Sequence, residues 1–217
     1  CLLLWTEDLL KPKVRVVAIS PGLVRTEQSA MHYGDAASLA AVERVVPMQR
    51  LALAAKASAT ALVVGYAERD GTRVYNSAAC FGPDGGRLAN HRKLQLYGPR
   101  ERSVYVPGDT YTTFRLGAES AAILICYDVE FAPHIKSLSD RGVTVILAPT
   151  ANMAPFGHVI RHTVPALAAN HGVTIAYANF CGTEGDLTYT GGSLIAGPHG
   201  EILAQAGDHP TLLVAEI

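Results

Sequence analysis

The stretch AAILICYDVEF at residues 121–131 decides the fold, because it joins a buried strand to a sharp turn. Residues 121–126 are almost entirely apolar, which is typical of a strand in a sheet that is covered on both faces. Residues 132–141 then have the apolar spacing of a helix, and residues 143–149 form a second apolar strand. This strand–helix–strand order predicts an alternating α/β fold.

The same alternation extends in both directions along the chain. An Asp84-Gly85-Gly86 turn predicts a hairpin between residues 74–81 and 87–93. Because predicted strands outnumber predicted helices in the second half, we expect stacked sheets with helices outside. The further strands are predicted at 14–20, 61–66, 173–179 and 212–217, and the further helices at 35–57, broken at Pro47, and at 157–171.

Composition excludes several classes of function. The 217 residues include 18 Lys and Arg against 19 Asp and Glu, for a net charge of −1. This balance gives no electrostatic reason to expect a nucleic-acid or anionic-membrane partner. No apolar run approaches the roughly 18 residues needed to span a bilayer. Since 49% of the residues are hydrophobic, a sizeable core is expected.

The four cysteines are Cys1, Cys80, Cys126 and Cys181, and no two of them form a Cys-x-x-Cys pair. This spacing disfavours a zinc ribbon or a disulfide scaffold and fits the reducing cytosol, so we expect a cytoplasmic protein. The first residue is Cys rather than Met, which leads us to expect a piece of a longer chain or a processed one.

Cys126 is the candidate nucleophile. We expect it to end its strand at the carboxyl edge of the sheet, where α/β proteins bind their ligands. The N–H of Tyr127 in the following turn is placed to stabilise an oxyanion. A lysine beside the thiol, for which Lys93 is the candidate, would lower its pKa. We predict that Cys80 and Cys181 are buried and unreactive, as most free cysteines are.

From about residue 53 to the end, the chain resembles the nitrilase superfamily of carbon–nitrogen hydrolases. The resemblance rests on an ordered set of short strings, none of which is decisive alone. These strings are LVVGYAER at 62–69, YNSA at 75–78, NHRKLQLY at 90–97, ICYDVEF at 125–131, PTANM at 149–153, AN at 178–179 with Gly182, GS at 192–193, and Pro198 with Gly200.

The resemblance implies an α-β-β-α sandwich and a Cys-Lys-Glu catalytic set. Cys126 matches the family's nucleophile, Lys93 its lysine, and Glu101 a second carboxylate eight residues after that lysine. The Tyr-Asp after Cys126 is more similar to amidases and carbamoylases than to true nitrilases, and Tyr127 is the predicted substrate-binding residue. The implied reaction converts a small amide or carbamoyl compound to acid and ammonia through a cysteine thioester. It implies no cofactor and no metal, and a homo-oligomer.

The first 52 residues fit this family less well, because they leave no room for its complete opening strand and helix. The family's general-base glutamate follows that opening, and Glu7 and Glu27 are the two candidates for it. Residues 1–52 resemble instead the C-terminal part of short-chain dehydrogenases, in which the stretch before residue 13 would be helical with Glu7 facing solvent. A Gly-rich dinucleotide loop and a Tyr-x-x-x-Lys pair are both absent from the sequence, so we reject dehydrogenase activity.

We therefore predict an atypical segment at 1–52 and a hydrolase domain at 53–217 that lacks or replaces its first strand and helix. Two other readings of the domain stay open: a thiol hydrolase in which a histidine activates Cys126, and a disabled or truncated domain that serves only in assembly. His158 and His162 have a metal-ligand spacing, but no Glu follows His158, which favours two polar helix residues.

Overall fold

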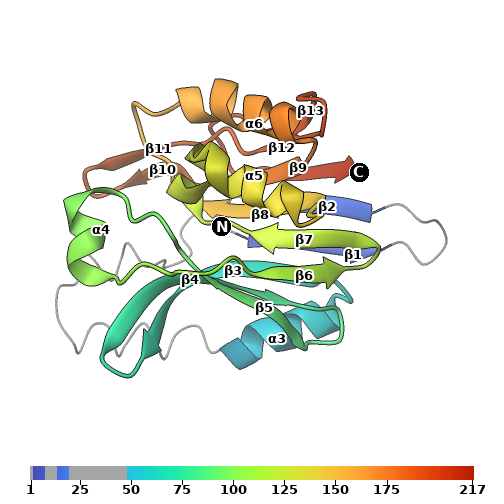
Figure 1. The fold of residues 1–217 in the computed structure, drawn as a ribbon, viewed down its shortest axis with the longest axis horizontal. Helices are drawn as coiled ribbons and strands as arrows, with labels where there is room; N and C mark the ends of the chain where they lie inside the picture. The colour runs from blue at the N-terminus through green and yellow to red at the C-terminus, as the bar shows by residue number, and fades with distance from the viewer. Residues whose placement is uncertain (1, 8–13, 20–47) are drawn as a thin grey trace.

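The computed structural model describes residues 2–7, 14–19 and 48–217, and side chains from residue 51 onward. Most of its strands belong to two six-stranded sheets (Figure 1). The strands of the first sheet are β1 (Leu2–Glu7), β2 (Val14–Ile19), β3 (Ala61–Asp70), β4 (Arg73–Phe81), β5 (Arg87–Arg92) and β14 (Leu212–Glu216). Their order is β14-β2-β1-β3-β4-β5, and every neighbouring pair is antiparallel.

The second sheet has a parallel centre. Its strands are β6 (Thr113–Leu116), β7 (Glu119–Ile123), β8 (Val145–Thr150), β9 (Thr174–Asn179), β12 (Leu194–Ala196) and β13 (Ile202–Gln205). The order is β13-β12-β9-β8-β7-β6, with β7, β8 and β9 parallel. A separate ribbon pairs β10 (Cys181–Glu184) with β11 (Leu187–Thr190). Since the parallel strands end at one edge, the loops after β7 and β8 lie close together.

Three helices cover the outer faces of the two sheets: α3 (Met48–Ala57), α5 (Ala132–Asp140) and α6 (Val164–His171). Helix α4 (Gly98–Val104) lies beyond one end of the sheets (Figure 1), and the chain also forms a 3₁₀ turn η1 (Cys126–Glu130) and a π-helical turn η2 (Val159–Thr163). In Figure 1, α5 and α6 lie over the second sheet, and α3 lies on the far side of the first.

Three hydrophobic layers hold this arrangement together. The middle layer fills the space between the sheets and is rich in alanine, including Ala78, Ala121 and Ala176. A second layer packs α5 and α6 onto the second sheet through Ile135, Leu138 and others. The third layer seats α3 on β3 and β4. Helix, sheet, sheet and helix therefore follow one another, which confirms the predicted α/β sandwich.

Most predicted strands are confirmed, but one expectation at Cys126 is wrong. Strand β7 ends at Ile123, and Cys126 begins η1 instead of closing the strand. The reason is local: the N–H of Leu124 still bonds to Leu147 O, whereas the N–H of Ile125 bonds to the Asp128 carboxylate. The chain thus leaves the sheet before it reaches the cysteine.

Two further expectations need correction. Residues 2–7 form strand β1 rather than the helix that the dehydrogenase resemblance suggested, because β2 and β3 pair with β1 on either side. The predicted helix at 157–171 begins with the π-helical turn η2, where the N–H of Val164 bonds to Val159 O. Pro165 has no N–H with which to continue an ordinary α-helical ladder. Residues 35–47 of the other predicted helix lie outside the described residues.

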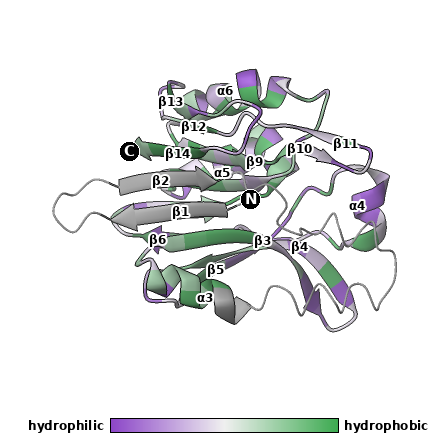
Figure 2. Ribbon diagram, turned by 180° about the vertical axis from the view of Figure 1, so that it is seen from behind, coloured by the Kyte–Doolittle hydropathy of each residue, from purple (hydrophilic) through white to green (hydrophobic). Residues whose placement is uncertain are grey.

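A polar cluster holds β3, β4 and β5 together just before Lys93. Glu68 accepts hydrogen bonds from Arg92 at 2.7 and 3.0 Å, from Ser77 at 2.6 Å and from Asn90 at 3.0 Å. The hydrogen bonds from Arg92 lower the pKa of Glu68 to about 2. In Figure 2 the polar half of the β3–β4 hairpin that carries Glu68 contrasts with its apolar half.

We predict that Glu68→Gln lowers the free energy of unfolding by about 1 to 2 kcal/mol at pH 7, since charge-assisted hydrogen bonds are lost. The folded-state pKa lies below the ordinary value of 4.5, so this stabilisation is present above pH 4.5 and disappears as the pH falls toward 2. Urea unfolding at pH 7 and pH 3 measures the difference. Asp140→Asn, which breaks an exposed pair with Lys136, is the control with little effect expected. An equal loss at both pH values would contradict the prediction.

Candidate active site

Cys126 is held in an unusual backbone conformation. Its φ is +49°, in the left-handed region that non-glycine residues rarely adopt. Among the described non-glycine residues, only Ala59 shares a positive φ. The side chain is partly buried and accepts a backbone hydrogen bond from Ala151, which follows β8. Such strain persists only where surrounding structure enforces it, and it is frequent at functional sites.

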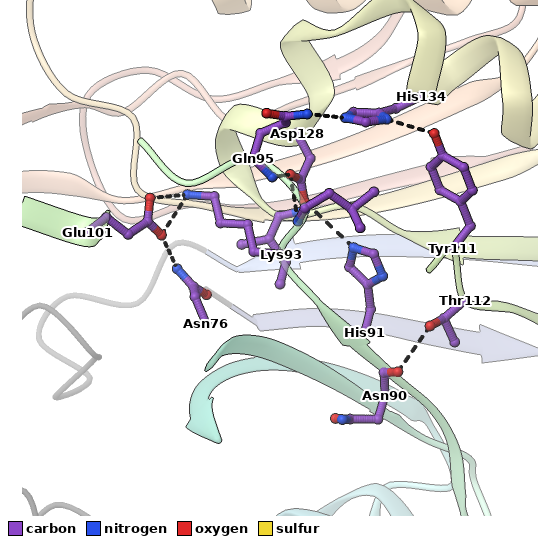
Figure 3. A network of polar contacts seen from close by, with 12 residues as sticks. Asn76, Asn90, His91, Lys93, Gln95, Glu101, Tyr111, Thr112, Asp128 and His134 are labelled. Carbon is purple, nitrogen blue, oxygen red and sulfur yellow. Dashed lines mark hydrogen bonds and ion pairs between the residues drawn. The ribbon is translucent and has the colours of Figure 1, made fainter. Parts of the chain in front are cut away.

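Lys93 and Glu101 form a buried ion pair (Figure 3), and Lys93 is close enough to Cys126 for its charge to act on the thiol. The Nζ of Lys93 lies 2.9 and 2.8 Å from the two carboxylate oxygens of Glu101. Lys93 is 3% exposed and Glu101 is 7% exposed. Although Glu101 lies between two arginines in sequence, α4 turns it inward, so it is not a surface charge.

Further contacts fix both members of the pair. The backbone of Lys93, directly after β5, accepts a bond from Gly108 and donates one to Asn76 O, each at 2.8 Å. Glu101 also accepts a bond from Asn76 Nδ2 at 2.7 Å and one from the N–H of Tyr97. Asn76 therefore orients both charges. Sequence analysis did not single it out, although it belongs to the YNSA string at 75–78.

The charges of this pair act on the thiol. Burial raises the pKa of Cys126, and the nearby Glu101 and Glu130 add to the rise, whereas Lys93 and the Ala151 hydrogen bond lower it. Burial alone would lower the pKa of Lys93, but Cys126 and Glu101 raise it overall. Lys93 is thus a protonated amine, and it is the cation that favours the thiolate.

Aromatic rings surround the cysteine turn. Tyr127 packs edge-on against Tyr97 at 5.2 Å and against Phe131 at 4.9 Å between ring centroids. Tyr97 in turn contacts Phe156 at 5.9 Å. Tyr127, the predicted substrate-binding residue, therefore lies in a cluster of aromatic rings directly after Cys126, and its role toward substrate stays a prediction.

Sequence analysis missed two carboxylates of the same turn, Asp128 and Glu130. Asp128 is fully buried, whereas Glu130 is partly buried. Burial raises the pKa of Glu130, and the positive charges of His158 and Lys93 partly offset the rise. In a 3₁₀ helix, residues i and i+3 share a face, so Glu130 follows Tyr127 on one side of η1. The only sign of Asp128 and Glu130 in the sequence was their position shortly after Cys126.

The remaining candidates lie elsewhere. Cys80 is buried in β4, where burial raises its pKa to about 12, and Cys181 is partly buried at the start of β10. Within the described residues, no group of three or more His, Cys, Asp or Glu could hold a metal ion, and His158 and His162 are exposed on the surface. No helix in that part of the chain is both long and apolar enough to cross a membrane. Glu7 is the last residue of β1, and Glu27 lies outside the described residues.

Comparison with known proteins gives consistent matches. A family model described as carbon-nitrogen hydrolase matches residues 17–217. The chain is 38% identical over 172 residues to "Hydrolase in pqqF 5'region" of Pseudomonas protegens, covering 78% of this chain and 60% of that protein. It is 34% identical over 171 residues to an (R)-stereoselective amidase of Pseudomonas sp, covering 78% and 62%. The chain thus spans about 60% of the length of these curated relatives.

A solved structure also resembles this fold. The amidase from Nesterenkonia sp. superposes with a TM-score of 0.80 at 32% identity, covering 92% of this chain and 75% of that one. One structure of a mutant of the amidase from Nesterenkonia sp. AN1 carries the acetamide moiety of fluoroacetamide, added covalently at the active-site cysteine. The dehydrogenase resemblance of residues 1–52, the boundary after residue 52, the cytoplasmic location and the homo-oligomer stay predictions.

We predict that Lys93→Met slows the alkylation of Cys126 by iodoacetamide at pH 8. Loss of the positive charge raises the pKa of the thiol further, and each unit of that rise removes about tenfold of the thiolate. Peptide mass spectrometry of alkylated samples over a range of pH separates Cys126 from Cys80 and Cys181.

Lys136→Met, which removes an exposed lysine on α5, is the matched control and should leave the alkylation of Cys126 unchanged. If Lys93→Met and the wild type give the same rate at every pH, Lys93 does not act on the thiol.

Proposed function

Because this chain belongs to the carbon–nitrogen hydrolase family, we propose that it hydrolyses a small amide or carbamoyl compound to an acid and ammonia through a cysteine thioester. One observation supports this most strongly. Cys126 sits at a strained turn within the field of the buried Lys93–Glu101 pair, which is the arrangement that a thiol nucleophile requires. The proposed reaction uses no cofactor.

In the first half of the reaction, a general base removes the proton of the Cys126 thiol, and the resulting thiolate attacks the amide carbon to form a C–S bond. The carbonyl electron pair moves onto oxygen, where the Lys93 ammonium and the N–H of Tyr127 stabilise the negative charge. The oxyanion then collapses, the C–N bond breaks, and the nitrogen leaves as ammonia after it takes a proton from a general acid. The product is a thioester on Cys126.

In the second half, a general base removes a proton from water, and the hydroxide attacks the thioester carbon. The C–S bond breaks and releases the acid and the thiolate. We propose that Glu7 or Glu27 provides this base. Glu101 holds the ammonium of Lys93 in place and keeps it charged, since its two oxygens are occupied by Lys93, Asn76 and Tyr97.

The two other readings make different predictions for the same site. If a histidine activates Cys126, Lys93→Ala should leave activity largely intact. If the domain is disabled and serves only in assembly, Cys126 should react with iodoacetamide no faster than Cys80. Burial raises the pKa of both thiols, but at Cys126 the charge of Lys93 opposes this rise, which favours the hydrolase reading.

We predict Cys126-dependent release of ammonia from a panel of small aliphatic amides and N-carbamoyl acids. Cys126→Ala should abolish release, because no thioester can form, whereas Cys80→Ala should retain most of it. Ammonia is measured directly, and circular dichroism shows that each variant is folded. Alanine variants of Glu7 and Glu27 then identify the base. A folded wild type without any release would contradict the proposed activity.

The charge of Glu130 predicts a preference for amides that carry no carboxylate of their own. Glu130 lies close enough to Cys126 to raise the pKa of the thiol, and its carboxylate would repel a carboxylate on a substrate bound there. We expect Glu130→Gln to reduce the preference for a neutral amide over a carboxylate-bearing amide of equal length by about tenfold in kcat/KM.

Because the pKa of Glu130 is raised, its carboxyl ionises at a higher pH than usual, and the wild-type preference should grow as the pH rises. Glu119→Gln is the matched control: it is also partly buried, at the start of β7, where Glu119 accepts a bond from Thr144. A preference that is the same in the wild type and in Glu130→Gln would contradict this role.

A further inference from the structure

The side chain of Asp128 joins the two chain segments that present Lys93 and Cys126 (Figure 3). One carboxylate oxygen accepts the N–H groups of Leu94 at 3.1 Å and Gln95 at 2.7 Å. The other oxygen accepts the N–H of Ile125 at 3.0 Å. The three donors therefore belong to the residues just after Lys93 and to the residue just before Cys126.

The hydrogen bonds of Asp128 do more than cap the 3₁₀ turn η1 in which it lies. The bond to Ile125 is local, but the bonds to Leu94 and Gln95 cross 34 and 33 residues of sequence. Asp128 is 0% exposed, so water cannot replace it as the acceptor. A carboxylate suits this position because each of its two oxygens can accept more than one bond, whereas an amide would turn a donor toward one of the N–H groups.

A second set of contacts supports the arrangement. The side chain of Gln95 lies 3.2 Å from His134 Nε2, and Tyr111 Oη lies 2.7 Å from His134 Nδ1. His91 is fully buried, with its Nε2 3.6 Å from Asp128. Neither ring nitrogen of His91 has a hydrogen-bond partner among the described residues. The buried carboxylate thus lies among polar side chains, of which His91 is fully buried and Gln95, Tyr111 and His134 are partly buried.

We infer that Asp128 is a positioning residue that holds the ammonium of Lys93 at the distance from Cys126 where it stabilises the thiolate. This inference rests on the proposed function for its catalytic meaning. By this inference the Asp128 carboxylate also affects the ionisation of the Cys126 thiol through Lys93. This coupling can be measured without turnover.

The test is a double-mutant cycle. The rate at which iodoacetamide alkylates Cys126 is measured in the wild type, in Asp128→Asn, in Lys93→Met and in the double variant. Asp128→Asn should slow the alkylation of Cys126 at pH 8 by about tenfold and move its pH profile upward, as Lys93→Met does. The double variant should be no slower than Lys93→Met alone, because both changes remove the same interaction. In the ammonia assay, kcat should fall while KM changes less than threefold.

Asp84→Asn is the matched control. Asp84 also accepts a backbone N–H, that of Gly86 at 2.8 Å, but in the exposed turn between β4 and β5. It should alter neither the pH profile nor kcat. If Asp128→Asn fails to fold, Asp128→Glu keeps both acceptor oxygens and should give a smaller upward shift of the same profile.

Two outcomes would overturn the inference. One is an unchanged pH profile in a folded but less stable Asp128 variant, which indicates a structural role alone. The other is an additive effect in the double variant, which indicates that Asp128 acts on the thiol independently of Lys93. Absence of ammonia release in the wild type, together with a non-additive cycle, would reject the proposed function and support the positioning role.

Discussion

The site depends on the buried ion pair between Lys93 and Glu101. Removing two charges from water costs several kcal/mol for each, and only close geometry with further hydrogen bonds compensates for that cost. Asn76 and the N–H of Tyr97 supply those bonds to Glu101. Without Glu101, Lys93 would be buried without its ion-pair partner. Burial would then lower the pKa of Lys93 and favour the neutral amine. A neutral lysine could stabilise neither a thiolate nor an oxyanion.

Lys93 and Cys126 follow strands of two different sheets. The first sheet provides Asn76 on β4 and delivers Lys93 at the end of β5, whereas the second sheet delivers Cys126 after β7. Small residues such as Ala78 and Ala176 fill the space between the sheets, which allows a close approach. The segments that carry Lys93 and Cys126 therefore meet, and the side chain of Asp128 accepts hydrogen bonds from both of them.

The sequence predicts the parts of this site that lie in recognisable strings, but not the contacts between them. The resemblance to the nitrilase superfamily identifies Cys126 and Lys93 through their strings and implies Glu101 as the carboxylate eight residues after Lys93. Whether Glu101 is buried depends on how the seven-residue α4 is rotated, which the flanking arginines do not reveal. The bonds of Asp128 to Leu94 and Gln95 span over 30 residues, so local pattern carries no sign of them. The departure of Cys126 from the strand has a local cause instead, since the Asp128 carboxylate three residues on accepts the N–H of Ile125, and the apolar run of residues 121–126 does not reveal this.

The charges around Cys126 bear on the general base that the proposed reaction requires. Burial, Glu101 and Glu130 hold the pKa of Cys126 above its ordinary value despite Lys93, so the resting thiol keeps its proton. Lys93 cannot accept that proton, because its own pKa is raised and it is already charged. Glu101 is engaged by three partners and would release Lys93 if it were protonated. In the proposed reaction another group must therefore accept the proton, and Glu7 and Glu27 are the candidates that the sequence offers for it.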